Sequence, residues 1–120
     1  MKPLRLAIPS VGIKGMRDVV SPVFAKAPVF TVIDIVEGEV KELRKEKNSA
    51  SDLKQGSGPI AAKNLKEMGV DVIVTGEMGP GARTLMEISG IKVIMVEPGI
   101  KVSDAVARAL SELNLVKSEE

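Results

Sequence analysis

Two glycine-rich segments carry the residue types in this sequence that are best suited to bind an anion. They are residues 56–59, Gly-Ser-Gly-Pro, and residues 76–81, Gly-Glu-Met-Gly-Pro-Gly. Each places a proline where a stretch of helical length begins, so we expect Pro59 and Pro80 at the first helical position. The free N–H groups and positive dipole end of a helix favour anions, and glycine lets a ligand approach the backbone. Neither segment matches a nucleotide-binding fingerprint, and both patterns are also typical of a plain helix start.

Other kinds of chemistry are excluded by composition. The 120 residues include no cysteine and no histidine, which removes disulfides, thiolate and imidazole metal ligands, and Ser-His or Cys-His catalytic pairs. We therefore expect no enzyme, no catalytic residue and no metal-ligating residue. A net charge of +1 and two aromatic residues argue against a nucleic-acid partner. No apolar stretch is long enough to span a membrane, and we expect a cytoplasmic protein without a membrane partner.

The helices that must position these segments belong to an internal repeat. Residues 58–74 overlay residues 79–95 at an offset of 21. Each unit runs from a Gly-Pro pair through a helical stretch to a glycine, Gly69 or Gly90, and then into a run of strand-forming residues. Glycine supplies the left-handed residue that ends a helix. The repeat therefore predicts two consecutive helix–strand units in one sheet.

The rest of the chain supplies three more strands. Residues 4–8 form a short apolar strand, and residues 29–36 and 40–47 form a hairpin with a charged second strand. A long irregular loop, residues 11–28, separates them, and polar residues 48–57 are expected to form a mobile loop.

This order predicts a single domain over residues 1–120. Its fold class is a three-layer α/β/α domain on a five-stranded mixed sheet with strand 2 antiparallel, the ribonuclease H-like motif. A nuclease of this fold needs a carboxylate on its first strand, and residues 4–8 have none. Asp34 is a single acid, which we expect to be solvated. Met16 and Met78 are expected in loops that face a cleft.

Several short motifs of the sequence are informative when they are taken together. They are residues 20–30 (Val-Ser-Pro-Val-Phe-Ala-Lys-Ala-Pro-Val-Phe), Asp34, residues 38–40 (Gly-Glu-Val), residues 56–59, residues 69–71 (Gly-Val-Asp) and residues 76–80. With these motifs the chain resembles the dinitrogenase iron-molybdenum cofactor biosynthesis family, which includes NifX- and NafY-type proteins and the C-terminal domain of NifB. The resemblance covers the chain from about Leu4 to Leu113.

The resemblance implies the ribonuclease H-like motif and a carrier of iron-molybdenum cofactor or of a precursor iron–sulfur cluster, with other cluster-biosynthesis proteins as partners. The family's loop typically reads Ser-x-His-Phe-Gly-x-Ala. Here Val23 takes the histidine position and Ala25 the glycine position. The physiological cofactor is left unknown, because the chain lacks the imidazole and thiolate donors of such clusters.

Two function classes stay open. In the first, a cleft formed by loop 10–26 and the two Gly-Pro helix starts binds an anionic metal cluster or another small anion, with Lys14, Arg17, Lys26 or Arg83 supplying charge. In the second, the cleft is vestigial and the chain is an interaction or oligomerisation module, such as a homodimer, with an exposed apolar patch at Val19, Val20, Val23 and Phe24. The predicted cofactor-binding residues are Ser21, Val23, Phe24, Lys26, Gly56, Gly58, Gly76, Glu77, Met78 and Gly79.

Overall fold

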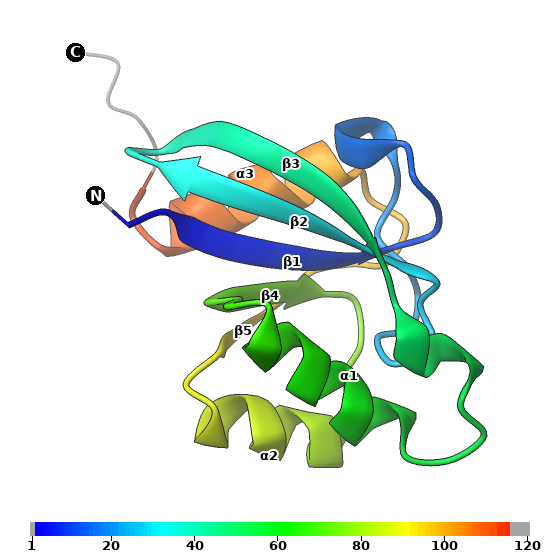
Figure 1. The fold of residues 1–120 in the computed structure, drawn as a ribbon. Coiled ribbons are helices and arrows are strands. Elements are labelled where there is room, and N and C mark those ends of the chain that lie inside the picture. The colour runs from blue at the N-terminus through cyan, green and yellow to red at the C-terminus, as the bar shows by residue number, and fades with distance from the viewer. Residues whose placement is uncertain (1, 116–120) are drawn as a thin grey trace.

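The structure, a computed structural model, describes residues 2–115 and contains a five-stranded mixed sheet (Figure 1). The strand order is β3-β2-β1-β4-β5, and β2 runs antiparallel to both neighbours. The strands are β1 (Leu4–Ser10), β2 (Val29–Val36), β3 (Glu39–Lys47), β4 (Val72–Thr75) and β5 (Lys92–Met95); the helices are α1 (Ser57–Glu67), α2 (Pro80–Ile88) and α3 (Val102–Glu112), with 3₁₀ turns η1 (Gly15–Arg17) and η2 (Ser49–Asp52). The predicted fold class is confirmed.

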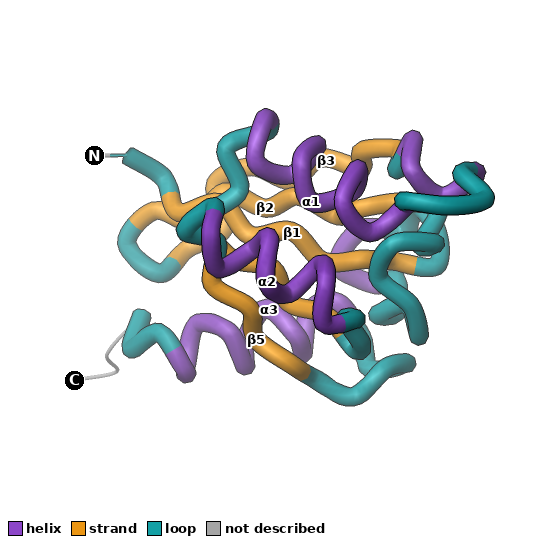
Figure 2. Tube along the Cα trace, turned by 90° about the horizontal axis from the view of Figure 1, so that it is seen from below, coloured by secondary structure: helices purple, strands orange, loops and turns teal. Residues whose placement is uncertain are grey.

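Two apolar clusters lie on opposite faces of the sheet. Along β1, Leu6 and Ile8 pack in the cluster that contains α3 residues, whereas Ala7 packs in the cluster that contains α1 and α2 residues. Side chains alternate between the faces of a strand, so one buried strand can serve both clusters. Figure 2 shows α1 and α2 side by side on one face, with α3 on the other.

The predicted helix–strand repeat is confirmed as α1-β4 and α2-β5. Gly69 and Gly90 end the two helices with φ of 74° and 75°, a conformation that glycine adopts without steric cost. Pro80 is the first residue of α2, as expected. The position of Pro59 differs from the prediction, because α1 begins at Ser57. A proline at the third position is still tolerated, since the first four N–H groups of a helix have no partner within it.

The long loop between β1 and β2 crosses from one layer to the other. Its first half lies on the α3 side, where η1 contacts α3 and β3. Val20 packs in the α3 cluster and Phe24 in the α1/α2 cluster, and both are buried. The crossing therefore takes place between residues 20 and 24, at the carboxyl end of β1.

A buried carboxylate holds the first half of this loop. Asp18 accepts hydrogen bonds from the backbone N–H groups of Lys14 and Val19. Burial raises the pKa of Asp18, but hydrogen bonds from the backbone at Lys14, Val19 and Gly12 outweigh it and keep the pKa below its ordinary value. Its own carbonyl accepts from Val102 N–H at the start of α3. Asp18 thus fixes the loop against the third helix.

The first half of the segment predicted to be a mobile loop, residues 48–52, is instead held by hydrogen bonds and forms the turn η2. Asn48 is buried, and its side chain donates to the carbonyls of Ala25 and Ala27 at 3.0 and 2.8 Å. The Asn48 side chain also accepts a hydrogen bond from the N–H of Ala50 and so caps the turn η2. One side-chain amide therefore joins this segment to the loop between β1 and β2.

Asp34 was expected to be solvated, and this prediction is wrong. Its side chain is 7% exposed and binds Arg5 through two hydrogen bonds, of 2.7 and 3.1 Å. The hydrogen bond from Arg5 holds the pKa of Asp34 below its ordinary value, and Asp34 in turn raises the pKa of Arg5. Arg5 also donates to the carbonyl of Met68 at 2.6 Å, at the end of α1. The Arg5–Asp34 pair therefore links β1, β2 and the carboxyl end of α1, at the end of the sheet opposite the glycine-rich segments.

Candidate functional site

Three segments meet at the carboxyl ends of β1 and β4. They are residues 21–26, residues 53–58 before and at the start of α1, and residues 76–82, which lead into α2. Ligands of open α/β sheets bind at this edge. We name these three segments together the helix-start site.

The first and third segments are packed tightly together. A Cβ added to Gly76 would lie 3.2 Å from the carbonyl oxygen of Ser21 and 3.1 Å from the Cβ of Pro98. Beside this contact, the backbone N–H of Phe24 donates to Glu77 Oε1 at 3.2 Å. A side chain at residue 76 would therefore have to push these loops apart by a few tenths of an ångström, and glycine avoids this.

The second and third segments meet where the two helices begin. A Cβ added to Gly58 would lie 3.6 Å from the Cβ of Ala82, in ordinary contact. At Gly56, Gly79 and Gly81 such a Cβ would have nothing within 4 Å. The backbone at these three glycines is open to a ligand.

The first and second segments are joined by Lys26. Its ammonium donates to the carbonyl of Leu53, while Asn48 binds the carbonyls of Ala25 and Ala27. Each segment of the helix-start site therefore contacts the other two. Hydrogen bonds of the Glu77 and Lys26 side chains to backbone groups, together with the close packing at Gly76, hold the three segments together.

The electrostatics of the helix-start site favour an anion. Neither α1 nor α2 has an acidic residue in its first turn or a side-chain cap, whereas α3 has Asp104 in its first turn. The free N–H groups of α1 and α2 therefore keep their positive potential. Glu77 is the carboxylate that the structure places against this site.

The structure distributes the predicted site residues over different environments. Val23 is 38% exposed, and its N–H donates to the hydroxyl of buried Ser21. Phe24 contributes its backbone N–H, because its ring is buried 5.8 Å from the ring of Phe30. The expected apolar patch is wrong for Val20 and Phe24, which are 0% and 1% exposed.

Some of the predicted methionines and cations lie in the helix-start site and others do not. Met16 packs against the α3 cluster, away from the site, whereas Met78 lies in the loop before α2 and packs against the α1/α2 cluster. Lys14 and Arg17 belong to the half of the loop that contacts α3, while Lys26 lies in the helix-start site. Arg83 is 3.9 Å from Glu87 within α2.

Sequence reasoning missed Thr75, which fixes the backbone of Glu77. The Thr75 hydroxyl is buried, donates to the carbonyl of Glu77 at 2.8 Å and accepts from its N–H at 3.4 Å. A threonine at the end of a strand, two residues before Glu77, is a pattern that could have indicated this turn. Asn48 was missed because its hydrogen bonds join residues that are distant in the sequence, and Asp18 was missed because its hydrogen bonds depend on loop geometry.

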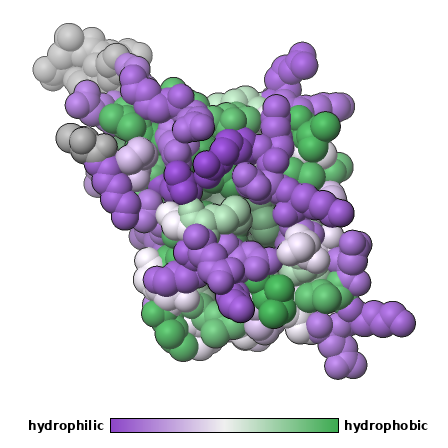
Figure 3. All heavy atoms as spheres, in the orientation of Figure 1, coloured by the Kyte–Doolittle hydropathy of each residue, from purple (hydrophilic) through white to green (hydrophobic). Residues whose placement is uncertain are grey.

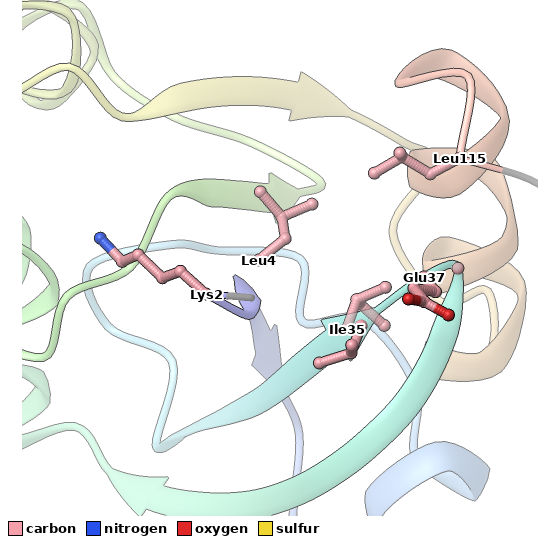
Figure 4. Close-up of a pocket in the computed structure, with 7 residues that line it drawn as sticks. Lys2, Leu4, Ile35, Glu37 and Leu115 are labelled. Carbon is pink, nitrogen blue, oxygen red and sulfur yellow. The ribbon is translucent and has the colours of Figure 1, made fainter.

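A separate cavity lies at the other end of the sheet. It has a volume of about 430 Å³ and is lined by Lys2, Leu4, Ile35, Val36, Glu37, Gly38 and Leu115. Figure 4 shows Leu4 and Ile35 from the sheet and Leu115 from beyond α3 around this space. It contains none of the predicted site residues.

The donor set limits how the helix-start site could hold a metal-containing ligand. Residues 2–115 contain no group of three or more histidine, cysteine, aspartate or glutamate side chains able to hold a metal ion. Within the same residues, no helix has the length and apolar character of a membrane span. The site has backbone donors and a lysine, which suit an anion bound without metal–protein bonds.

Comparison with known proteins agrees with this architecture. The chain is 32% identical to the orange protein of Desulfovibrio gigas, solved in its apo form, with a TM-score of 0.82 over 90% of this chain and 88% of that one. It is 31% identical to a putative NifB protein from Thermotoga, with a TM-score of 0.70 and full coverage of both chains. An uncharacterised protein of Methanocaldococcus jannaschii is 27% identical over 77% of this chain and 78% of its own length.

The family comparison covers nearly the whole chain. The sequence pattern described as dinitrogenase iron-molybdenum cofactor matches residues 5–112, which include all three helices and, except for Leu4, all five strands. The family's description names a cofactor, which agrees with a cofactor-binding or carrier protein. The chain therefore belongs to the dinitrogenase iron-molybdenum cofactor family.

Proposed function

We propose that this protein is a non-enzymatic carrier that holds an anionic metal–sulfur cluster at the helix-start site without metal–protein bonds. The observation that carries the proposal is the meeting of two uncapped helix starts, with open backbone at Gly56, Gly79 and Gly81. Family membership supports a metal cluster as the cargo. The absence of cysteine and histidine from the sequence supports binding through hydrogen bonds and charge.

The predicted residues have distinct roles in this proposal. Gly56, Gly58 and Gly79 leave room for the cargo, and Gly76 lets the loops close beside it. Lys26 supplies positive charge, while Ser21 and Val23 fix the turn that presents the N–H of Phe24. Met78 contributes by packing under the start of α2.

A pair of substitutions at Gly79 tests the proposal without unfolding the protein. Gly79 is the N-cap of α2 with extended backbone angles, φ −69° and ψ 161°, and both Asp and Asn are favourable N-cap residues. Gly79→Asp also places a negative charge where the cargo would sit, whereas Gly79→Asn is its neutral control. We expect both variants to be as stable as the natural chain in urea denaturation.

Binding is measured by anaerobic calorimetric titration with tetrathiomolybdate, molybdate and phosphate. A carrier of metal–sulfur anions should bind tetrathiomolybdate most tightly, and Gly79→Asp should weaken that binding about tenfold or more relative to Gly79→Asn. Metal analysis after anaerobic purification from a cluster-producing strain should find iron or molybdenum. Equal affinity of the two variants, or a metal-free protein that binds none of the three anions, would overturn the proposal.

A second candidate function, an interaction module, is favoured by one observation. Val11 and Ile13 are 53% and 69% exposed on a loop that Asp18 holds in place. Figure 3 shows hydrophobic (green) atoms next to hydrophilic (purple) ones on the right-hand side of the view. If the loop joins two copies of the chain, sedimentation should show a dimer that Ile13→Glu dissociates. A monomer at all concentrations would exclude this homodimer.

A further inference from the structure

The helix-start site already contains one bound anion, the carboxylate of Glu77. Glu77 Oε1 accepts the N–H of Phe24 at 3.2 Å, and among the described residues this N–H has no other acceptor. Glu77 lies two residues before the N-cap of α2, so the helix dipole also favours its negative charge. The backbone at this position therefore binds an oxyanion in the free protein.

The backbone of Glu77 is held rigidly, but its side chain is not. The buried Thr75 hydroxyl binds both the N–H and the carbonyl of Glu77, and Gly76 is packed between Ser21 and Pro98. The Glu77 side chain is exposed, and the Phe24 N–H is the single partner that the structure gives its carboxylate. Rotation of this side chain would release the N–H without moving the loop.

We propose that Glu77 is a built-in competitor that occupies the anion site in the free protein and must leave when an anionic cargo binds. The inference rests on the proposed function and names the residue that limits affinity and specificity at the same site. A bound anion would accept a hydrogen bond from the Phe24 N–H, but the protein would lose the hydrogen bond between that N–H and the Glu77 carboxylate. Glu77 also repels any anion nearby, and this repulsion grows with the charge of the anion.

Two substitutions separate the parts of this competition. Glu77→Gln removes the charge but keeps a side-chain oxygen that can accept the Phe24 N–H. Glu77→Ala removes both. Glu97→Gln is the matched control, because Glu97 is an exposed glutamate after β5 that binds Arg108 at 2.5 Å and lies outside the three segments of the site. Only one hydrogen bond, made by an exposed side chain, is lost at Glu77, so we expect all variants to stay folded.

The measurement is calorimetric titration with tetrathiomolybdate at low salt, with the Phe24 amide followed by ¹H–¹⁵N NMR. We expect Glu77→Gln to bind about tenfold more tightly than the natural chain, Glu77→Ala at least as tightly as Glu77→Gln, and Glu97→Gln no differently. The Phe24 amide resonance should move when the natural chain binds the anion. In free Glu77→Ala it should already differ from that of the natural chain.

The outcomes distinguish this inference from the proposed function. If the natural chain binds the anion and Glu77→Gln binds equally or more weakly, Glu77 is no competitor and only the inference fails. If the anion binds to Glu77→Ala but not to the natural chain, competition by Glu77 is supported; if the natural chain is also purified without metal, the proposed carrier function fails. If neither the natural chain nor any Glu77 variant binds an anion, both the inference and the proposed function fail.

Discussion

The two ends of helix α1 are treated in opposite ways. At its carboxyl end, Arg5 donates to the Met68 carbonyl and is itself held by Asp34. At its amino end, Gly56 provides no side-chain cap, and the open backbone lies beside the start of α2. The negative end of the helix is neutralised by a protein cation, and the positive end is left for an anion. One end therefore contributes stability, and the other is the end at which we propose that an anion binds.

The largest expected effect in testing this difference between the two ends of α1 is the loss of stability caused by Asp34→Ala. Asp34→Ala leaves Arg5 without its carboxylate in a half-buried position, and removing one member of a buried pair costs about 3 kcal/mol. We expect this loss in the free energy of unfolding measured in urea. Affinity for tetrathiomolybdate should not change, because the pair lies at the far end of the sheet.

The control for this substitution is Glu42→Ala, since Glu42 is exposed and lies opposite Asp34 in the β2–β3 ladder. It should change stability by less than about 0.5 kcal/mol. An equal loss in both variants would show that the Arg5–Asp34 pair does not stabilise this end.

Two glycines within the helix-start site should respond in opposite directions. Gly76→Ala places a methyl group 3.1 to 3.2 Å from Pro98 and Ser21 and should cost about 2 kcal/mol. Gly81→Ala adds its methyl group to open space within α2 and should stabilise by about 0.5–1 kcal/mol. Thermal denaturation of the two variants measures the difference. If both variants change the stability in the same direction, the inference that Gly76 is tightly packed and Gly81 is open is wrong.

Acid should weaken the Arg5–Asp34 pair at the carboxyl end of α1. The pKa of Asp34 is lowered below the value of 3.8 of an ordinary aspartate by its hydrogen bond to Arg5. A carboxylate with a depressed pKa in the folded state stabilises the protein above its unfolded pKa, and this stability is lost as the pH falls through the folded pKa. The free energy of unfolding should therefore decline below about pH 4. Asp34→Asn should show a shallower decline, with the remainder due in part to Asp18, and an identical decline would contradict this assignment.

The smallest expected effect is that of the Lys26 charge in the helix-start site. Lys26→Met removes an exposed ammonium that binds the Leu53 carbonyl, and an exposed charge contributes about 0.5–1 kcal/mol, or two- to fivefold in affinity. We expect that weakening in titrations with tetrathiomolybdate. Arg17→Met should have less effect, because Arg17 ends the turn η1 on the α3 side. A larger effect at Arg17 would move the anion site toward α3.

The fold could be predicted from the sequence because its signals are local. Glycines at residues 69 and 90, the proline at residue 80 and the apolar runs after them report the conformation of their own neighbourhoods. The pairing of Arg5 with Asp34 joins two strands, and the ordering of residues 48–52 depends on carbonyls more than 20 residues away. Such contacts leave no periodic signal in a single sequence.

The glycine-rich segments of the site could be predicted, but their environment could not. The sequence indicates helix starts at residues 56–59 and 76–81, and the structure brings them into contact. Phe24 was predicted as a site residue, but the structure buries its ring and leaves only its backbone N–H in the site. This difference depends on where the loop crosses the edge of the sheet. The placement of Lys14 and Arg17 in the other layer has the same cause.

The internal repeat has an electrostatic consequence. Because α1 and α2 each precede a strand of the same parallel pair, they run in the same direction, and their positive ends lie side by side. Like ends of neighbouring helix dipoles repel each other, so the cargo-free protein holds an electrostatic tension at this edge. An anion placed between the two helix starts relieves it. Loading would then tighten the whole α1/α2 layer, and the melting temperature would report occupancy of the site.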